Sequence, residues 1–571
     1  MRMIKILAVP GFLTLFVAAG SAQIARVSVP VSPLTAVSGV VAQAPRLQAS
    51  PSFLGESLSA APILPLATPA LPARNASPTP TSAETTEIVS ALNQVKRAAP
   101  TVSAGNSAST EEIGEVYDGR FIRAVAALDK ESEPRPEGLP KQWVRRQTTR
   151  SQAGKTVALQ RRAQVKGFPQ AARNARILAR HNDHYTHGVP IGRVTDQKES
   201  GRCWIFAGLN MVRSLLIARG KVDKQFEFSE NYLYFFNQLE KANRYLERVA
   251  AGANEKEEKA SLSSQLQSVA PDIEDSGNFE SFQFLVEKYG LVPKNAMPET
   301  ASSGSTGGLN AELNYSLGIT AREMLADAPG AKGRGRRHAR ETRQRGMSRV
   351  WKILAAHLGT PPSRFEHLTD DRQRSYTPLH FAKKFVAVNL DDYIQVGSWP
   401  RVKQGIVYAE GDSDIAARSN FRYIDVGVDR MEELALKALS RNQPVYIFAS
   451  QNRDFDSKTG IMHPGIYDRS SVYGFTAKEK REHLTRASRH DLGMNDPSHL
   501  MVLTGYDRPD PNKPVVKFRV ENSGGAGVGD SGVFHMYREW FRQNAFSIIV
   551  HKSLLSRLER TAWKQEAEDI P

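Results

Sequence analysis

The chain of 571 residues contains a single cysteine, Cys203. One cysteine cannot form a disulfide within the chain, so the fold has to be held together by core packing. An unpaired cysteine is either a small buried apolar residue or a free reactive thiol. Apolar residues follow Cys203 at helical spacing, and Gly220 supplies a stop. The sequence therefore predicts a helix whose first turn carries the thiol.

The first 22 residues have the pattern of a signal peptide. Arg2 and Lys5 give a basic start, residues 6–19 an apolar stretch, and residues 20–22 a small-residue cleavage site. We therefore expect an exported protein, periplasmic or secreted, and no later stretch resembles a membrane span.

The formal net charge of +16 and the pI near 9.7 favour acidic partners such as nucleic acid or anionic surfaces, although charge says nothing about fold. The most basic stretch, residues 332–345, leads into an apolar run at residues 350–354. We interpret it as an exposed loop before a helix, with anion binding as a minor alternative.

The remaining pattern is helical first and strand-like later. Helices are expected after Cys203, after the capping residue Ser229, and before Gly290. Short β-type runs are expected at 444–448, 499–503, 515–520, 533–537 and 546–550. This order predicts an α+β fold with a ligand cleft between a helical and a strand-rich part.

Four residues carry the candidate chemistry. At a helix N-terminus, backbone amides and the helix dipole stabilise a thiolate, so Cys203 is expected to be activated before an imidazolium forms an ion pair with it. His499 begins a predicted strand, and Asn522 ends the next, so a hairpin would bring the amide oxygen to the imidazole. Gln197 precedes the cysteine closely enough to join its backbone N–H in an oxyanion hole.

These motifs resemble those of papain-type cysteine peptidases, and most closely the bleomycin hydrolase and aminopeptidase C branch. The similarity covers roughly residues 180–555. The segments that carry it are Val194–Gln197, Ser200–Trp204, Phe226–Leu233, Leu291–Lys294, His357–Pro362, Asp456–Met462, Ser498–Gly505 and Arg519–Ser523.

The resemblance implies a papain-like fold and peptide-bond hydrolysis through a thioester acyl-enzyme, without a metal or organic cofactor. It makes Cys203 the nucleophile, His499 the general acid/base, Asn522 the residue that orients the imidazole, and Gln197 the oxyanion donor. Members of this branch are typically homohexamers in which a C-terminal arm restricts cleavage to peptide N-termini, and some bind nucleic acid.

The expected domain organisation follows from these features. It comprises a signal peptide (1–22), an Ala/Pro/Ser-rich linker or pro-segment (23–110), an N-terminal extension packing on the catalytic domain (111–190), a papain-like domain with helical insertions (191–560) and a tail (561–571).

Two features depart from the family. Gly524 stands where these enzymes usually place a tryptophan that shields the hydrogen bond between Asn522 and His499, so either solvent weakens this bond or the shield comes from elsewhere. The tail, with Glu566, Glu568 and Asp569, does not resemble the usual terminus. The unusual tail leaves endopeptidase action open, whereas it does not affect the cysteine peptidase chemistry. We expect an aminopeptidase-like enzyme, with a papain-like endopeptidase as the first alternative and, as a non-enzymatic alternative, a weakened relative that binds anionic polymers or nucleic acid.

Two other motifs are weaker. Residues 529–532 resemble a serine-nucleophile loop but are expected to form a glycine-rich turn between strands. His181, His184 and His187 have a spacing that suits a metal, but their polar neighbours favour a loop.

Overall fold

The computed structural model divides the chain into two units, residues 1–136 and 137–571. In the first unit it describes a three-stranded antiparallel sheet, β1 (Ile4–Val9), β2 (Phe12–Ala18) and β3 (Ile24–Pro30). Most of the predicted linker lies outside the described residues. In the second unit the structure describes residues 138–569 except 152–156, 253–261, 327–333, 370–371, 410–414, 416–420, 452 and 476–484.

A twelve-stranded sheet forms the centre of the second unit, in the order β11-β12-β15-β14-β13-β10-β16-β7-β9-β8-β17, with β4 paired to β13. The five predicted strands are present as β10, β13, β14, β15 and β16. The bounds are β4 (His187–Gly188), β7 (Tyr393–Gly397), β8 (Val407–Ala409), β9 (Arg422–Asp425), β10 (Val445–Ala449), β11 (Phe455–Asp456), β12 (Ile461–Met462), β13 (His499–Asp507), β14 (Lys517–Glu521), β15 (Val533–Tyr537), β16 (Ala545–His551) and β17 (Glu568–Asp569).

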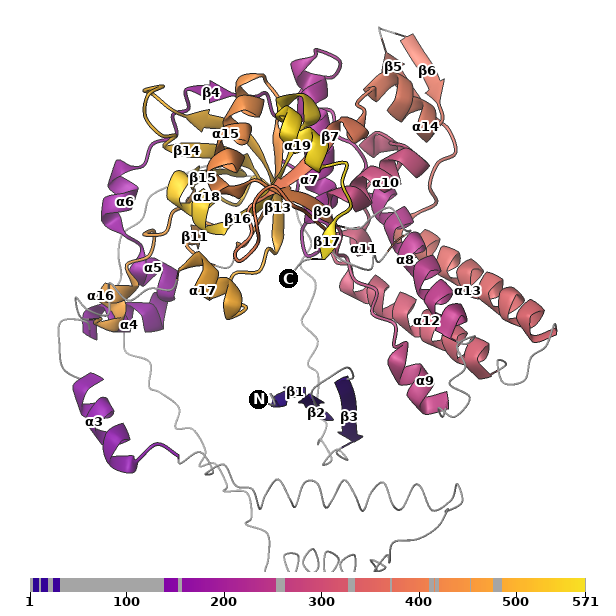
Figure 1. Ribbon diagram of the computed structural model, residues 1–571, viewed down its shortest axis with the longest axis horizontal. Helices are drawn as coiled ribbons and strands as arrows, with labels where there is room; N and C mark the ends of the chain where they lie inside the picture. The colour runs from indigo at the N-terminus through magenta and orange to yellow at the C-terminus, as the bar shows by residue number, and fades with distance from the viewer. Residues whose placement is uncertain are drawn as a thin grey trace, which may run out of the picture. The chain divides into compact units, whose positions relative to one another are not determined.

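The helical part precedes most of the sheet in sequence and lies beside it in space (Figure 1). Its main helices are α7 (Cys203–Ala218), α8 (Glu230–Gly252), α10 (Phe279–Tyr289), α12 (Gly307–Ala326) and α13 (Arg334–Leu358). The hydroxyl of Ser229 accepts the N–H of Tyr232 at 3.0 Å, and α10 ends at Gly290, which has a φ of 82°. These helices and the sheet confirm the predicted α+β fold.

Shorter elements connect or flank these two parts. The remaining helices are α3 (Lys141–Ser151), α4 (Val157–Lys166), α5 (Phe168–Ala172), α6 (Ala175–Arg180), α9 (Leu262–Ser268), α11 (Ala301–Gly304), α14 (Pro378–His380), α15 (Gly427–Ser440), α16 (Arg469–Tyr473), α17 (Arg486–Asp491), α18 (Arg538–Asn544) and α19 (Arg557–Ala562). A hairpin, β5 (Phe365–Thr369) with β6 (Arg372–Tyr376), and a π-helical segment, Phe381–Val386, lie between α13 and β7.

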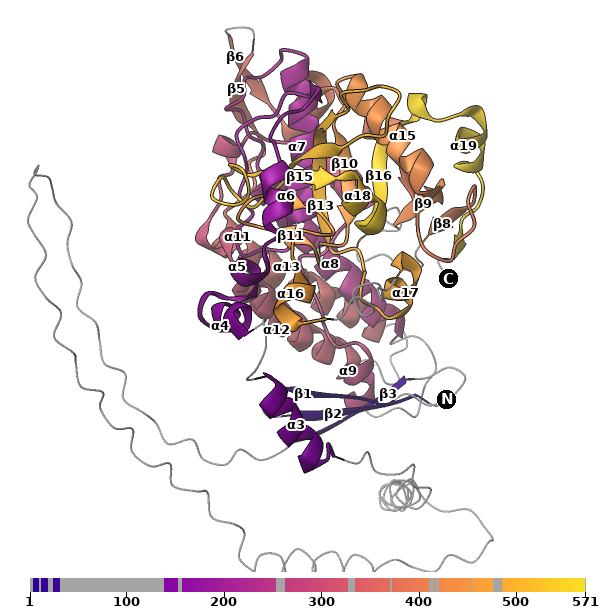
Figure 2. The same ribbon diagram turned by 90° about the vertical axis from the view of Figure 1, so that its left-hand side faces the viewer.

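Alternating side chains along the strands build two cores, one on each face of the sheet. On β10, Tyr446 packs into the core of the helical part, whereas Val445 and Ile447 pack into the opposite core. Figure 2 shows α7 on one side of β10 and β13, and α15 on the other. The N-terminal end of α7 therefore lies against β13, the strand that begins at His499.

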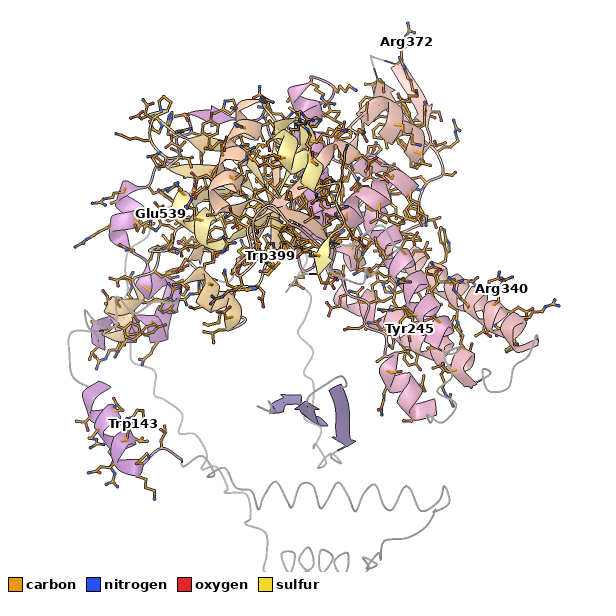
Figure 3. All side chains as sticks on the ribbon, in the orientation of Figure 1. Trp143, Tyr245, Arg340, Arg372, Trp399 and Glu539 are labelled. Carbon is orange, nitrogen blue, oxygen red and sulfur yellow. The ribbon has the colours of Figure 1, made fainter. Side chains whose placement is uncertain are left out.

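The basic stretch is not the predicted loop, because from Arg334 onward it belongs to α13. Figure 3 shows Arg340 near the outer end of this helix. Glutamates pair with neighbouring arginines: Arg337 with Glu341 at 3.1 Å, Arg343 with Glu247 at 2.8 Å, and Arg349 with Glu323 at 3.1 Å. These pairs reduce the free positive charge that anion binding would need. No described helix has the length and hydropathy of a membrane span.

Residues 173–188, which precede Gln197 in the sequence, pack on the edge of the sheet where β11, β12 and β15 lie. Arg173 forms an ion pair with Asp456 at 2.7 Å, and Tyr185 lies 2.6 Å from His535. Residues 187–188 then pair with β13 as β4, which leads the chain directly towards Gln197.

A buried ion pair ties α7 to the sheet and generates a stability prediction. Arg213 and Glu521 lie 2.6 Å apart, and both side chains are at most 1% exposed. Burial raises the pKa of Glu521 to about 7, although Arg213 lowers it. Replacing Arg213 with alanine leaves a buried carboxylate without its cation, so we expect a loss of about 3–5 kcal/mol in the free energy of unfolding.

This loss is expected to be larger at pH 8 than at pH 5. In the wild type the raised pKa of Glu521 costs stability only between its ordinary value and about 7, where the folded state keeps a proton that the unfolded state loses. Because Arg213 lowers this pKa, the variant's folded-state pKa is higher still, so above pH 7 the variant goes on losing stability while the wild type does not. Urea unfolding midpoints at both pH values test this for Arg213→Ala, with Arg213→Met combined with Glu521→Leu as the matched control, which should lose much less. Equal losses in the single and the double variant would contradict the prediction.

Candidate active site

Cys203 is the first residue of α7, as predicted, and its side chain is 8% exposed. It is the free cysteine of the chain. Arg202 occupies the N-cap and makes no side-chain cap, since a guanidinium has no acceptor for a backbone N–H; it binds Glu299 at 2.8 Å. The first amides of α7 therefore remain available to the sulfur or to a ligand beside it.

The hairpin of β13 and β14 brings the predicted imidazole and amide together. The two strands pair antiparallel, with Val502 opposite Glu521, so His499 and Asn522 lie at the same end of the hairpin. The His499 Nε2 atom is 2.8 Å from Asn522 Oδ1. Since the amide oxygen can only accept, Nε2 carries the proton and Nδ1 is the ring nitrogen left for another partner.

The start of β13 also reaches the thiol. The backbone amide of Leu500, which follows His499, acts on the Cys203 sulfur and lowers its pKa. Leu500 and Cys203 belong to the same hydrophobic core. Packing of α7 against β13 therefore places the Cys203 sulfur next to the first two residues of β13, His499 and Leu500.

Gln197 lies in the loop before α7 and beside the Asn522 turn. Its backbone N–H donates to Ser523 O at 2.8 Å, and its side-chain Nε2 donates to Ser200 O at 2.6 Å. A primary amide has a second N–H, which remains for an oxyanion. The structure thus brings all four predicted residues into one region between α7 and the β13–β14 hairpin.

Ser523 is a site residue that sequence reasoning missed. Its hydroxyl donates to Gln197 Oε1 at 2.5 Å, and because Oε1 is held there, Nε2 is directed towards Ser200 in the loop that leads to Cys203. The signal available in the sequence was its position directly after Asn522, but a serine at a turn has no distinctive pattern.

The expectation that the helix end activates Cys203 before any partner arrives is wrong, because the pKa of the thiol is raised overall. Burial raises the pKa of the Cys203 thiol to about 11, which outweighs the effect of the backbone amides of Leu500, Trp204 and Cys203 itself; Asp275 raises it further. Burial likewise lowers the pKa of His499, against the hydrogen bond to Asn522. Each group by itself favours its neutral form, so the thiolate depends on transfer of its proton to the imidazole.

The missing tryptophan does not leave the Asn522 side of the Asn522–His499 bond exposed. Asn522 is 6% exposed and Ser523 3% exposed, whereas His499 is partly exposed, so the fold covers the amide side of the bond without a tryptophan. Bonds from the Gln197 and Gly525 amides to Ser523 and Thr195 close the loop over this turn.

The other candidate motifs do not form sites. His181 lies 3.1 Å from the Tyr537 hydroxyl, His184 is exposed, and His187 stacks on Tyr506. Within the described ranges no group of three His, Cys, Asp or Glu side chains is arranged to hold a metal. The glycine-rich segment 529–532 is a turn between β14 and β15, as predicted.

The C-terminal tail returns to the sheet edge. β17 pairs parallel with β8, and both Glu568 and Asp569 are exposed. Arg422 on β9 donates to the carbonyl oxygens of Trp563 and Gln565 at 2.7 Å each. The Arg422 backbone N–H is 3.4 Å from Glu280 in the first turn of α10, so the tail is held where α10 meets the sheet.

Comparison with known proteins decides the family. The sequence model described as the Peptidase C1-like family matches residues 141–571. The chain belongs to this family. The prediction of a cysteine-type peptidase with a papain-like fold is thereby confirmed.

Individual relatives agree with this assignment. The chain is 29% identical over 410 residues to Aminopeptidase G of Lactobacillus delbrueckii subsp. lactis, covering 71% of this chain and 91% of the relative. It is 31% identical over 384 residues to Aminopeptidase C of Streptococcus thermophilus, covering 66% and 84%. The crystal structure of PepW from Lactobacillus rhamnosis HN001 is similar with a TM-score of 0.66 and 29% identity, covering 75% of this chain and 96% of that one.

The contact between Ser523 and Gln197 leads to a prediction about the oxyanion donor. Removing one such donor costs about 10²–10³-fold in rate, so this is the expected loss in kcat/KM for Gln197→Ala. Ser523→Ala leaves the amide in place and held only by its bond to Ser200 O, and should cost about tenfold or less. A double-mutant cycle measures the coupling: Ser523→Ala should add almost nothing in the Gln197→Ala background, and fully additive losses would refute the orienting role.

Proposed function

We propose that this protein is a cysteine aminopeptidase in which Cys203 is the nucleophile and His499 the general acid/base. The observation that carries this proposal is the juxtaposition of the His499–Asn522 pair, 2.8 Å apart, with the helix start that bears the thiol. Peptides are the substrates that the family acts on, and the relatives named above are aminopeptidases.

The reaction would begin with transfer of the Cys203 proton to His499. Attack of the sulfur on the peptide carbonyl forms a tetrahedral intermediate, whose oxyanion accepts hydrogen bonds from the Cys203 backbone N–H and the Gln197 amide. His499, held in orientation by Asn522, then delivers its proton to the leaving amine. The resulting thioester is hydrolysed by a water that the same imidazole activates.

Preference for peptide N-termini is supported by the place of the tail. Its acidic residues follow Trp563, whose carbonyl Arg422 holds beside the first turn of α10. Phe279, the residue before Glu280, packs on Tyr446 with ring centroids 5.5 Å apart, and the Tyr446 hydroxyl donates to Trp204 O at 3.3 Å. Carboxylates on the tail would attract the ammonium group of a free peptide N-terminus near the start of α7.

We also propose that the protein is exported after removal of residues 1–22 and assembles into a homo-oligomer, by family resemblance a hexamer. The basic, apolar and small-residue pattern of the first 22 residues supports export. Native mass spectrometry of the protein recovered from outside the cytoplasm of its own host tests both points: we expect a subunit that begins near Gln23 and a multiple of its mass. A full-length monomer would contradict both.

A matched substrate pair tests the peptidase proposal. Peptides with a free amino terminus and the same peptides N-acetylated are incubated with the wild type and with Cys203→Ala. We expect rapid release of the first residue from the free peptides only, and loss of nearly all activity in the variant, since no thioester forms without the sulfur.

The other outcomes identify the alternatives. Equal cleavage of acetylated peptides would favour an endopeptidase, and full activity of Cys203→Ala would refute the proposed nucleophile. A wild type that neither cleaves peptides nor reacts with a thiol-directed peptidase inhibitor, but binds an anionic polymer in a salt-sensitive way, would favour the non-enzymatic alternative.

A further inference from the structure

Asp275 lies between α9 and α10 and gathers donors from three separate segments. Its Oδ2 accepts the Gly201 backbone N–H at 2.6 Å and the Thr306 hydroxyl at 2.5 Å. Its Oδ1 accepts the Tyr234 hydroxyl at 2.6 Å and the Asn310 amide at 2.7 Å. These bonds hold the pKa of Asp275 below its ordinary value despite its burial, so the carboxylate is charged at neutral pH.

The backbone of the same residue binds the nucleophile helix. Its carbonyl oxygen accepts the Trp204 indole N–H at 2.8 Å. Asp275 thus holds the turn around Cys203 on both sides, through Gly201 before it and Trp204 after it. Tyr234 belongs to α8 and Asn310 to α12, so Asp275 connects the turn to two helices that lie further along the sequence.

Two glycines permit this close approach. A Cβ on Gly201 would come within 2.7 Å of Asp275 Cβ, and a Cβ on Gly277 would collide with the Trp204 ring. Neither contact leaves room for a larger residue, so each glycine lets the side chain of the other loop pack directly on its backbone. The geometry is that of a built anchor and not of a chance surface contact.

We propose that Asp275 is a positioning residue for Cys203: it fixes the turn from Gly201 to Trp204 and keeps one negative charge behind the sulfur. This role rests on the proposed function of Cys203 as nucleophile. The two parts of the role make different predictions, because hydrogen bonds set the geometry of the turn whereas the charge acts on ionisation of the thiol.

The charge has a defined sign. A nearby carboxylate disfavours the thiolate, and Asp275 accordingly raises the pKa of Cys203. Neutralising it with Asp275→Asn should move thiol ionisation to lower pH by roughly 0.5–1 unit, the size expected for one partly screened charge. At the same time, loss of hydrogen bonds to the turn should lower kcat/KM at the optimum pH about tenfold or more.

The test uses Cys203 itself as the probe, since it is the one cysteine of the full chain. The rate of alkylation by iodoacetamide is followed by intact mass between pH 5 and 11, beside the pH profile of kcat/KM. Tyr234→Phe is the matched control, because it removes a donor to Asp275 Oδ1 but leaves the charge. We expect its alkylation midpoint to match that of the wild type and its kcat/KM to fall less than that of Asp275→Asn.

Each result decides the role. An unchanged midpoint in Asp275→Asn, or an equal shift in Tyr234→Phe, would overturn the electrostatic part. If Asp275→Asn does not fold, Tyr234→Phe and Thr306→Val still test positioning, and unchanged kcat/KM in both would overturn it. Failure of the proposed function looks different: Cys203→Ala would retain activity, while the alkylation midpoints would still report the effect of the Asp275 charge.

Discussion

Packing of the start of α7 against the start of β13 is the contact on which the rest of the site depends. Cys203 and His499 are 296 positions apart in the sequence, so local structure cannot bring them together. The shared core around Trp204, Leu500 and Tyr446 fixes the helix on the sheet, and the buried pair of Arg213 and Glu521 fixes it a further three turns along. Catalytic geometry is therefore a product of core packing.

The same packing works against ionisation. It removes Cys203 and His499 from water, which disfavours a charge on either of them alone. An ion pair costs less to bury than two separate charges, because the opposite charges stabilise each other. A buried thiol and imidazole therefore ionise together, by transfer of one proton from the thiol to the imidazole. Asn522 contributes by favouring the imidazolium, while the amides at the start of α7 favour the thiolate.

Sequence reasoning found the groups whose pattern is local and missed those whose role depends on distant partners. The closeness of His499 and Asn522 is predictable because two short apolar strands and their spacing indicate a hairpin, and the place of Cys203 at a helix start because apolar residues follow it at helical spacing. Arg334 to Arg345 were assigned to a loop because their charge and glycines hid a helix that packs on α8 and α12. The pKa of Cys203 was misjudged because burial by β13 has no signature near the cysteine.

The contacts of Asp275 explain how the turn around Cys203 is held in place without a disulfide. A disulfide would hold the nucleophile turn to a neighbouring loop covalently, whereas here a carboxylate does so through hydrogen bonds from Gly201, Tyr234, Thr306 and Asn310. Charge-assisted bonds of this kind are about twice as strong as neutral ones, and four of them converge on one side chain. The arrangement leaves a negative charge near the sulfur, so geometric precision and ease of ionisation oppose each other at this position. The backbone amides at the start of α7 and from Leu500 act in the direction that offsets this charge.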